Sequence, residues 1–168
     1  ASIDMQKRTQ KSQEALQLAQ QKAVTFGHPH VGCDHAVLAL AEPHDGLIAG
    51  LLQRMGVAKD QFAARLEQEL RKRPRMSGSG YQPDKIFLDQ DLAQALTSAE
   101  QQAAKMRDEY VSVEHLFLAL LAQSKGGLKD AFAQAKIDEA RFLNAMKEVR
   151  GNQRVQSANP EATYEALG

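Results

Sequence analysis

The feature that most constrains the fold is an internal repeat with an offset of 80 residues. When His35 is placed on His115, the stretch 9–70 aligns with 89–150 without a gap. Identical pairs are mostly small or apolar, and their first members are Gln10, Ala15, Leu16, Ala19, Gln21, Ala23, Val31, His35, Leu38, Ala39, Leu40, Gly46 and Phe62. A duplicated unit keeps its packing positions while solvent-facing positions change, so the pattern predicts two copies of one small fold.

Both copies begin with the signals of two consecutive helices. Thr9 and Asp89 are good N-cap residues, because their side-chain oxygens can accept an unpaired backbone N–H, and an amphipathic helix follows each of them. The next helices, 33–41 and 113–122, are apolar on nearly every side. That composition is typical of a helix in the centre of a bundle, so we expect these two helices to form the core of each copy.

Two further helices complete each copy. Short third helices are expected at 48–55 and 128–135, and Gly56 is placed to end the first of them in a left-handed conformation. The fourth helix has apolar residues at four-residue spacing, Phe62, Leu66 and Leu70 in the first copy and Phe142 and Met146 in the second. The sequence therefore predicts an all-α fold of two pseudo-symmetric four-helix repeats.

The boundaries between these units follow from composition. We expect a domain over 1–150, divided into repeat one (9–73), a loop rich in Pro, Gly and Ser (74–88, extended over 85–88) and repeat two (89–150). The polar run after Gly151 predicts a flexible linker, which would span about 15–18 Å if it behaves as a random coil. Asn159, Pro160 and Glu161 then carry the signals of a helix start, so 151–168 is interpreted as a linker and the beginning of a helix that leads to a further domain.

Charge and composition narrow the classes of function. The 21 basic and 21 acidic residues cancel, so no overall field favours nucleic acid or an anionic membrane as a partner. No membrane-length apolar run or signal pattern is present, and the single cysteine cannot form an internal disulfide. These features favour a cytoplasmic protein.

The segment GHPHVGCDH, residues 27–35, raises the possibility of chemistry because it holds three histidines and the single cysteine. Histidine and cysteine are the usual zinc ligands, and a Cys/His pair can also act as a nucleophile. In the second copy, however, only the last histidine is kept, and Val113 replaces Cys33. We therefore favour a capping role for His35 and His115 at the third position of their helices, surface turn positions for His28 and His30, and no metal ligand or catalytic residue.

Other catalytic signals are weak. The chain lacks the Gly-rich ATP-binding motif, so we expect no enzymatic activity and no cofactor in this segment. Asp108, Glu109 and Glu114 form an acidic group near the start of the central helix of the second copy. On the residues alone, this group is interpreted as a solvated turn whose charge matches the helix dipole.

The paired motifs VGCDHAVLAL and VSVEHLFLAL resemble the Clp N-terminal repeat domain of AAA+ unfoldases. The segments TQKSQEALQLAQ, RMSGSG, DEYVSVEHLFLALL and especially GNQRVQSANPEATYEAL are similar to the ClpB-type branch, the ATP-dependent disaggregases. The resemblance covers essentially the whole chain. It implies a non-catalytic domain on a mobile linker at the rim of a hexameric ring, whose missing ATPase domains would use ATP and Mg²⁺.

The same resemblance implies partners and site residues. It implies binding of unfolded or aggregated proteins, cooperation of the parent homohexamer with a DnaK-type chaperone system, and a monomeric state for this fragment. Family members carry functional residues at positions that match Thr9, Asp108 and Glu114, so these three are our candidate substrate-binding residues. The alternative is the N domain of a protease-partnered unfoldase of the ClpA/ClpC type, which docks adaptors or marked substrates.

Overall fold

The computed structural model describes residues 7–76, 86–151 and 155–161, and this part of the chain contains two sets of four helices. The first set is α1 (Gln10–Thr25), α2 (Cys33–Ala41), α3 (Leu47–Arg54) and α4 (Lys59–Arg71). The second set is α5 (Gln90–Lys105), α6 (Val113–Ala122), α7 (Gly126–Gln134) and α8 (Glu139–Arg150). The predicted all-α fold of two four-helix repeats is confirmed.

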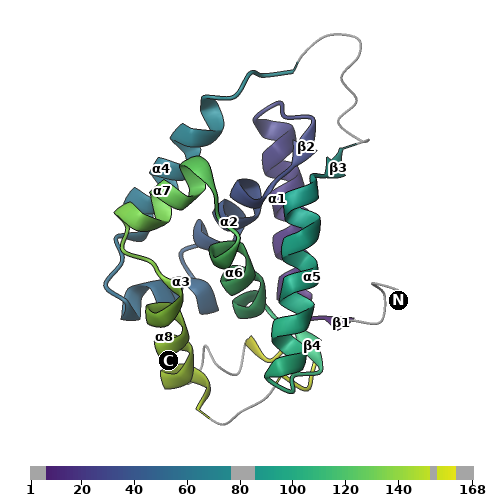
Figure 1. The fold of residues 1–168 in the computed structure, drawn as a ribbon, viewed down its shortest axis with the longest axis vertical. Helices are drawn as coiled ribbons and strands as arrows, with labels where there is room; N and C mark the ends of the chain where they lie inside the picture. Colours follow the sequence, from purple (N-terminus) through teal and green to yellow (C-terminus); the bar gives the residue numbers. More distant parts are fainter. Residues whose placement is uncertain (1–6, 77–85, 152–154, 162–168) are drawn as a thin grey trace.

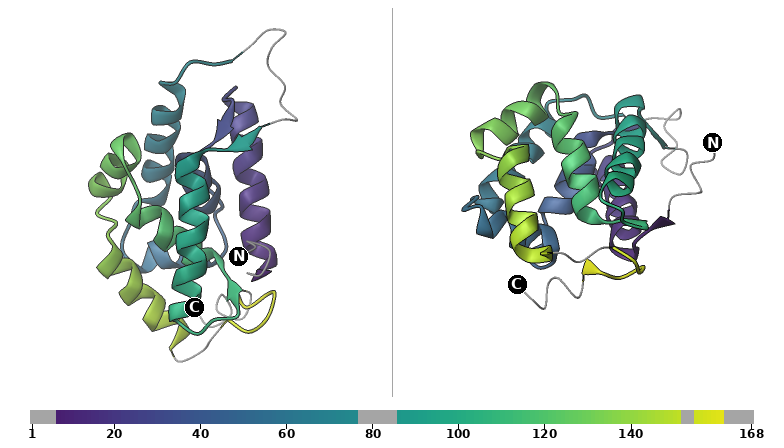
Figure 2. Two further views of the ribbon diagram at one scale, coloured as in Figure 1. Left: turned by 45° about the vertical axis from the view of Figure 1, so that its right-hand side comes forward. Right: turned by 60° about the horizontal axis from the view of Figure 1, so that its bottom comes forward.

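The helices form three layers, with α2 and α6 in the middle (Figure 1). Both views of Figure 2 place α1 and α5 next to each other on one side of this centre and α4, α7 and α8 on the other. The central position explains the composition of α2 and α6, since every residue from His35 to Ala41 and from Val113 to Leu121 is buried. Across the two repeats, α4 packs on α7 and α3 packs on α8.

Two short pairs of parallel strands join the two repeats. The strand before each repeat pairs with a strand inside the other one: β1 (Lys7–Arg8) with β4 (Tyr110–Val111), and β3 (Phe87–Leu88) with β2 (His30–Val31). The registers correspond at the 80-residue offset, because Lys7 faces Tyr110 as Phe87 faces His30. The pairing is therefore what an approximate twofold relation between the repeats requires.

Helix starts and turns repeat the same correspondence. The Thr9 hydroxyl accepts from the Ser12 amide at 3.2 Å, and the Asp89 carboxylate accepts from the Leu92 amide at 2.8 Å, so both predicted N-caps are confirmed. The turn after the third helix is left-handed in both copies, with φ of 72° at Gly56 and 59° at its counterpart Lys136.

A group of four aromatic rings, three from the second repeat and one from the first, joins the two repeats. Phe117 stacks on Phe142 with ring centroids 4.8 Å apart, and it meets Phe132 edge-on at 5.8 Å. Phe62, the counterpart of Phe142, stacks on Phe132 at 5.4 Å. These buried rings belong to α4, α6, α7 and α8, so they fix the packing of one repeat against the other.

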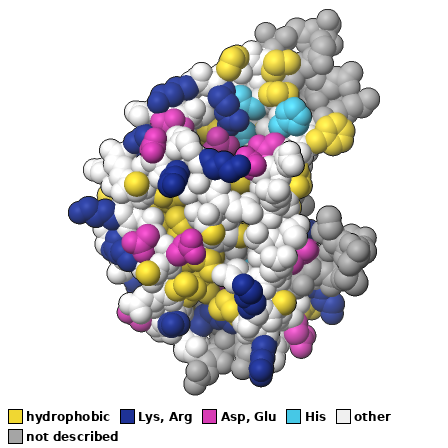
Figure 3. All heavy atoms as spheres, viewed as in Figure 1, with side chains coloured by type: hydrophobic (Ala, Val, Ile, Leu, Met, Phe, Trp, Pro, Cys, Tyr) yellow, Lys and Arg dark blue, Asp and Glu magenta, His cyan; other side chains and the backbone are white. Residues whose placement is uncertain are grey.

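Element boundaries differ little from the sequence expectations. The second helices are found at the predicted residues, while α3 begins one residue and α7 two residues earlier than predicted. The predicted extended piece is β3, although Lys85 and the loop from Ser77 onward lie outside the described residues. No helix in the described ranges is both long enough and apolar enough to span a membrane. On the face shown in Figure 3, basic and acidic side chains are interspersed.

Candidate functional site

The start of α6 carries a buried network of charged side chains around Asp108. The Asp108 Oδ1 atom accepts hydrogen bonds from Arg150 Nη2 at 2.7 Å and from the Val155 amide at 2.8 Å. Its Oδ2 atom lies 2.7 Å from His115 Nε2. Burial acts to raise the pKa of Asp108, but the hydrogen bonds from His115, Arg150 and Val155 outweigh it and hold this pKa at about 2. Asp108 is therefore a fixed, buried carboxylate.

His115 connects this carboxylate to the first turn of α6. Its Nδ1 atom accepts from the Ser112 amide at 2.9 Å, which is the predicted capping interaction. Since Nδ1 is an acceptor, the ring hydrogen lies on Nε2 and is donated to Asp108. The Ser112 hydroxyl donates to Glu114, whose other oxygen lies 3.7 Å from Arg150 Nη1. The interpretation of Asp108 and Glu114 as a solvated acidic turn is wrong, because both are buried and ion-paired.

Thr9 and Glu161 form a second buried contact beside this network. The Thr9 hydroxyl donates to Glu161 Oε2 at 2.5 Å, and the Val113 amide donates to the same oxygen at 3.2 Å. Burial raises the pKa of Glu161, and the nearby Glu114 acts in the same direction, whereas the hydrogen bonds from Thr9 and Val113 act to lower it. The carboxylate lies at the N-terminus of α6, where unpaired amides and the helix dipole favour an anion.

Residues 155–161, which we name the 155–161 segment, connect the two parts of the site. The Val155 carbonyl accepts from the Glu109 amide at 2.7 Å, and the Ala158 carbonyl accepts from the Gln10 amide at 2.8 Å. Val155 and Glu161 are fully buried. The prediction of a free flexible linker is therefore wrong for this segment, because a buried valine and backbone hydrogen bonds hold it against β4 and α1. Most of the predicted helix after Pro160 lies outside the described residues.

The structure brings the three candidate residues together around the start of α6. Their exposed fractions are 0% for Thr9, 6% for Asp108 and 0% for Glu114. Direct contact of these residues with a substrate stays a prediction. Arg150 and Glu161 are the partners that sequence reasoning missed. The apolar Val155 within a polar run was a signal that could have indicated the packed segment.

The first repeat has a histidine pair at the equivalent place. His35 Nδ1 accepts from the Gly32 amide at 2.9 Å, and its Nε2 lies 2.8 Å from His28 Nδ1. His28 thus takes the place of Asp108. The predicted surface position is wrong for His28, which is 2% exposed, although His30 is exposed. Figure 3 shows histidine side chains at the end of the molecule that carries β2 and β3.

The side chains of His28, Cys33 and His35 do not have the properties that a zinc site or a reactive thiolate needs. Burial, followed by the charges of nearby aspartates, raises the pKa of Cys33 to about 12, so its thiol is protonated at neutral pH. Burial also lowers the pKa of His35 to about 4. Among the described residues, no group of three or more His, Cys, Asp or Glu side chains could hold a metal ion.

An open groove lies between α1 and the turn that joins α2 to α3, and we name it the α1 groove. It has a volume of about 290 Å³. Its apolar walls are formed by Ala15, Leu18, Leu40, Leu47, Ile48 and Val113. Lys11, Glu14 and Asp45 are exposed along it, and Glu161 lines it as well. The groove therefore combines an apolar surface with charged residues that remain in contact with water.

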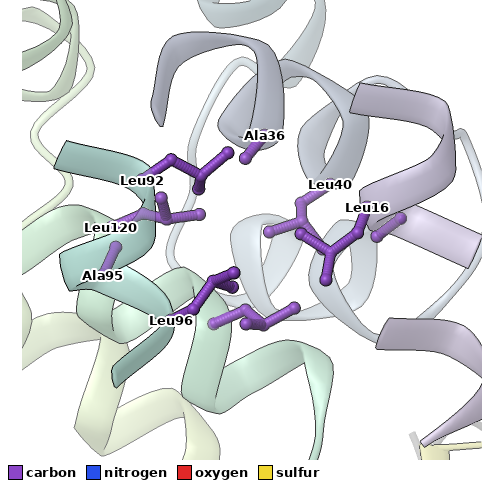
Figure 4. A pocket seen from close by; sticks show the side chains of 9 residues that line it. Leu16, Ala36, Leu40, Leu92, Ala95, Leu96 and Leu120 are labelled. Carbon is purple, nitrogen blue, oxygen red and sulfur yellow. The ribbon is translucent and has the colours of Figure 1, made fainter. Parts of the chain in front are cut away.

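A narrower apolar crevice lies where α1 and α2 of the first repeat face α5 and α6 of the second (Figure 4). Its walls include Leu16 and Leu96, which correspond at the 80-residue offset, and Leu40 and Leu120, which correspond in the same way. Leu40 and Ala15 line both the crevice and the groove. The apolar surface of the groove thus continues toward the interface of the two repeats.

Comparison of the sequence with known protein families agrees with the internal repeat, because one family profile matches the chain twice. The profile of the family described as "Clp repeat (R) N-terminal domain" matches residues 7–135 and 88–165. Chaperone protein ClpB of Nitratidesulfovibrio vulgaris is 45% identical over 166 residues, which are 98% of this chain and 19% of the relative. Chaperone protein ClpB of a Bacillus cereus strain is 40% identical over 165 residues, with the same two coverages. The chain thus spans about a fifth of the length of these relatives.

Solved structures share the fold. The Hsp104 N-terminal domain from Candida albicans has a TM-score of 0.80 at 23% identity, covering 93% of this chain and 99% of that one. A ClpV N-domain solved in complex with a VipB peptide has a TM-score of 0.60 at 17% identity, covering 85% and 89%. With this fold, the family profile and the ClpB relatives, the chain belongs to the Clp repeat N-terminal domain family.

Proposed function

We propose that this chain is the client-binding N-terminal domain of a ClpB-type ATP-dependent disaggregase. The observation that carries the proposal is the open α1 groove, with apolar and charged residues in its lining, in a domain whose ClpB relatives are named chaperones. Exposed apolar segments of unfolded or aggregated proteins are the clients that fit such a groove, since they present apolar side chains without a fixed shape. The ClpV N-domain solved with a VipB peptide is a further protein of this fold that binds a peptide.

The dimensions of the groove favour weak binding. Burying one client side chain of the size of leucine contributes about 1.5–3 kcal/mol, and one or two such side chains fit a groove of about 290 Å³. Association and ordering of the client oppose this gain, so we expect dissociation constants on the order of 0.1–1 mM for a single segment. Weak binding suits a domain that must release its client to the rest of the parent protein.

The activity of the parent protein is part of the same proposal. We infer a cytoplasmic homohexamer in which other domains bind ATP and Mg²⁺ and thread the client, together with a DnaK-type chaperone system. The ClpB names of the relatives support this inference. They also favour the disaggregase over the N domain of a protease-partnered unfoldase.

A binding measurement with a groove variant tests the proposal. Leu18 is half-buried in the wall of the α1 groove, and Leu18→Glu would place a charge there. Leu143→Glu is the matched control, because Leu143 is also half-buried but lies on α8 away from the groove. Fluorescence anisotropy with labelled, permanently unfolded α-lactalbumin (reduced and carboxyamidomethylated) should show binding to the wild type and to Leu143→Glu.

The two possible outcomes are clearly separated. We expect Leu18→Glu to weaken binding at least tenfold while circular dichroism and thermal unfolding show a folded domain. Equal affinities for the folded Leu18→Glu and Leu143→Glu variants, or tighter binding of native α-lactalbumin than of the unfolded form, would reject the proposal.

A further inference from the structure

Glu161 belongs to two features at once, since it lines the α1 groove and anchors the 155–161 segment through Thr9 and Val113. We propose that the docked segment supplies one wall of the α1 groove, so that docking of the segment and client binding stabilise each other. This inference rests on the proposed function of the groove. Thr9, Asp108 and Glu114 then influence client binding as positioning residues that hold the segment and the start of α6.

The first argument is the direct contribution of Glu161 to the groove. Its side chain is fully buried, and the Oε2 atom is fixed by the Thr9 hydroxyl and the Val113 amide. Its Oε1 atom has no hydrogen-bond partner among the described residues. Val113, which donates to Glu161, also lines the groove. If the segment leaves, Glu161 no longer forms part of the groove wall. The Val113 amide then also loses the Glu161 oxygen that accepts its hydrogen bond.

The second argument concerns the first turn of α1. The Gln10 amide donates to the Ala158 carbonyl, so the segment fixes the backbone directly before Lys11. Lys11, Glu14 and Ala15 follow on this helix and line the groove. The segment therefore positions the groove from two sides, through α6 and through α1.

The other end of the segment is anchored by residues other than those of the groove. Val155 is fully buried, its amide donates to Asp108, and its carbonyl accepts from Glu109. None of these three residues lines the α1 groove. A change at Val155 can thus release the segment without altering any groove residue. Its effect on client binding therefore measures the docking of the segment and not a change of the groove residues.

By linkage, an effect of docking on client affinity requires an equal effect of the client on docking. Val155→Ser removes the buried apolar side chain, and Gln156→Ala is the matched control because Gln156 is exposed in the same segment. Hydrogen exchange of the Val113 amide, measured without client, reports release of Glu161. Anisotropy with unfolded α-lactalbumin, measured on the same samples, reports client affinity.

We expect Val155→Ser to speed Val113 exchange at least tenfold and to weaken client binding three- to tenfold, while Gln156→Ala changes neither. Glu161→Gln, which keeps the shape of the side chain, should also weaken client binding. Saturating client should slow Val113 exchange in the wild type.

Two results would overturn the coupling, and a third would point to a different failure. Faster Val113 exchange with unchanged or tighter client binding in Val155→Ser would show that the segment is not a wall that the client uses. Unchanged Val113 exchange in this variant would show that the ends of the segment do not move together. A wild type that binds no client would instead reject the proposed function, and the Leu18→Glu comparison detects that failure separately.

Discussion

The buried His28–His35 pair predicts a loss of stability in mild acid. His35 accepts from the Gly32 amide and lies 2.8 Å from His28, with its own side chain fully buried. Burial lowers its pKa from 6.5 to about 4, because the charged imidazolium cannot be solvated there. The perturbation is His35→Gln, since a glutamine at this helix position keeps an acceptor for the Gly32 amide and does not titrate.

The sign and size follow from linkage. The unfolded chain binds a proton at His35 near pH 6.5, whereas the folded chain binds it only near pH 4. Stability is therefore complete above pH 6.5 and is lost as the pH falls from 6.5 toward 4. With about 1.36 kcal/mol for each pKa unit, His35 accounts for a loss of about 3 kcal/mol by pH 4. Burial lowers the pKa of His28 as well, which adds to the loss in the same direction.

Urea unfolding of both proteins at several pH values between 7 and 4 measures this contribution. His35→Gln will be less stable at pH 7 because its side chain packs less well against His28. The difference in unfolding free energy between wild type and variant should shrink by about 3 kcal/mol between pH 7 and pH 4, since groups that do not contact His35, such as Glu161, cancel in the difference. Parallel curves over this range would show that His35 takes up its proton at the same pH in the folded and unfolded chains, and they would refute the reasoning.

Three other predictions concern stability, each measured by chemical denaturation at pH 7 unless stated. Phe117→Ala removes a buried ring that contacts two other rings within the second repeat and should cost about 3–5 kcal/mol; a cost below 1 kcal/mol would contradict the described core. Asp108→Asn breaks a buried ion pair and should cost about 3–5 kcal/mol. The pKa of Asp108 is about 2 in the folded chain and 3.8 in the unfolded chain. The wild type should therefore lose about 2 kcal/mol of unfolding free energy as the pH falls from 4 to 2, and an unfolding free energy that stays constant over this range would contradict the ion pair. Gly50→Ala, in the middle of α3 with open space at the new Cβ, should stabilise the protein by about 0.5–1 kcal/mol. Gly56→Ala should destabilise it by about 1 kcal/mol, because φ is 72° at this turn. A Gly56→Ala variant more stable than Gly50→Ala would contradict the turn geometry.

Much of the fold could be predicted because its signals are local or repeated. Thr9 and Asp89 mark helix starts by residue type, and the apolar runs of α2 and α6 indicate central helices without knowledge of their neighbours. The offset between His35 and His115 relates the repeats directly. It did not reveal the strand exchange, because two-residue strands leave almost no pattern in a sequence.

The chemistry of the site was less predictable. Asp108 lies 42 residues from Arg150 and 47 from Val155, so no local pattern joins them. Charged residues near a turn are usually solvated, and no local pattern indicates that Asp108 is buried and paired. The position of His28 was misjudged for the same reason, since its burial follows from its equivalence to Asp108 in the folded repeat.

The location of client binding is the central claim, and chemical-shift mapping tests it most directly. Unfolded α-lactalbumin should be added in steps to the ¹⁵N-labelled domain, and amide shifts recorded at each step. We expect the largest changes at Ala15, Leu18, Leu40, Leu47 and Ile48, which line the α1 groove. Changes concentrated instead at the exposed Phe87 and Leu88 of β3, or no changes at saturating client, would contradict the account.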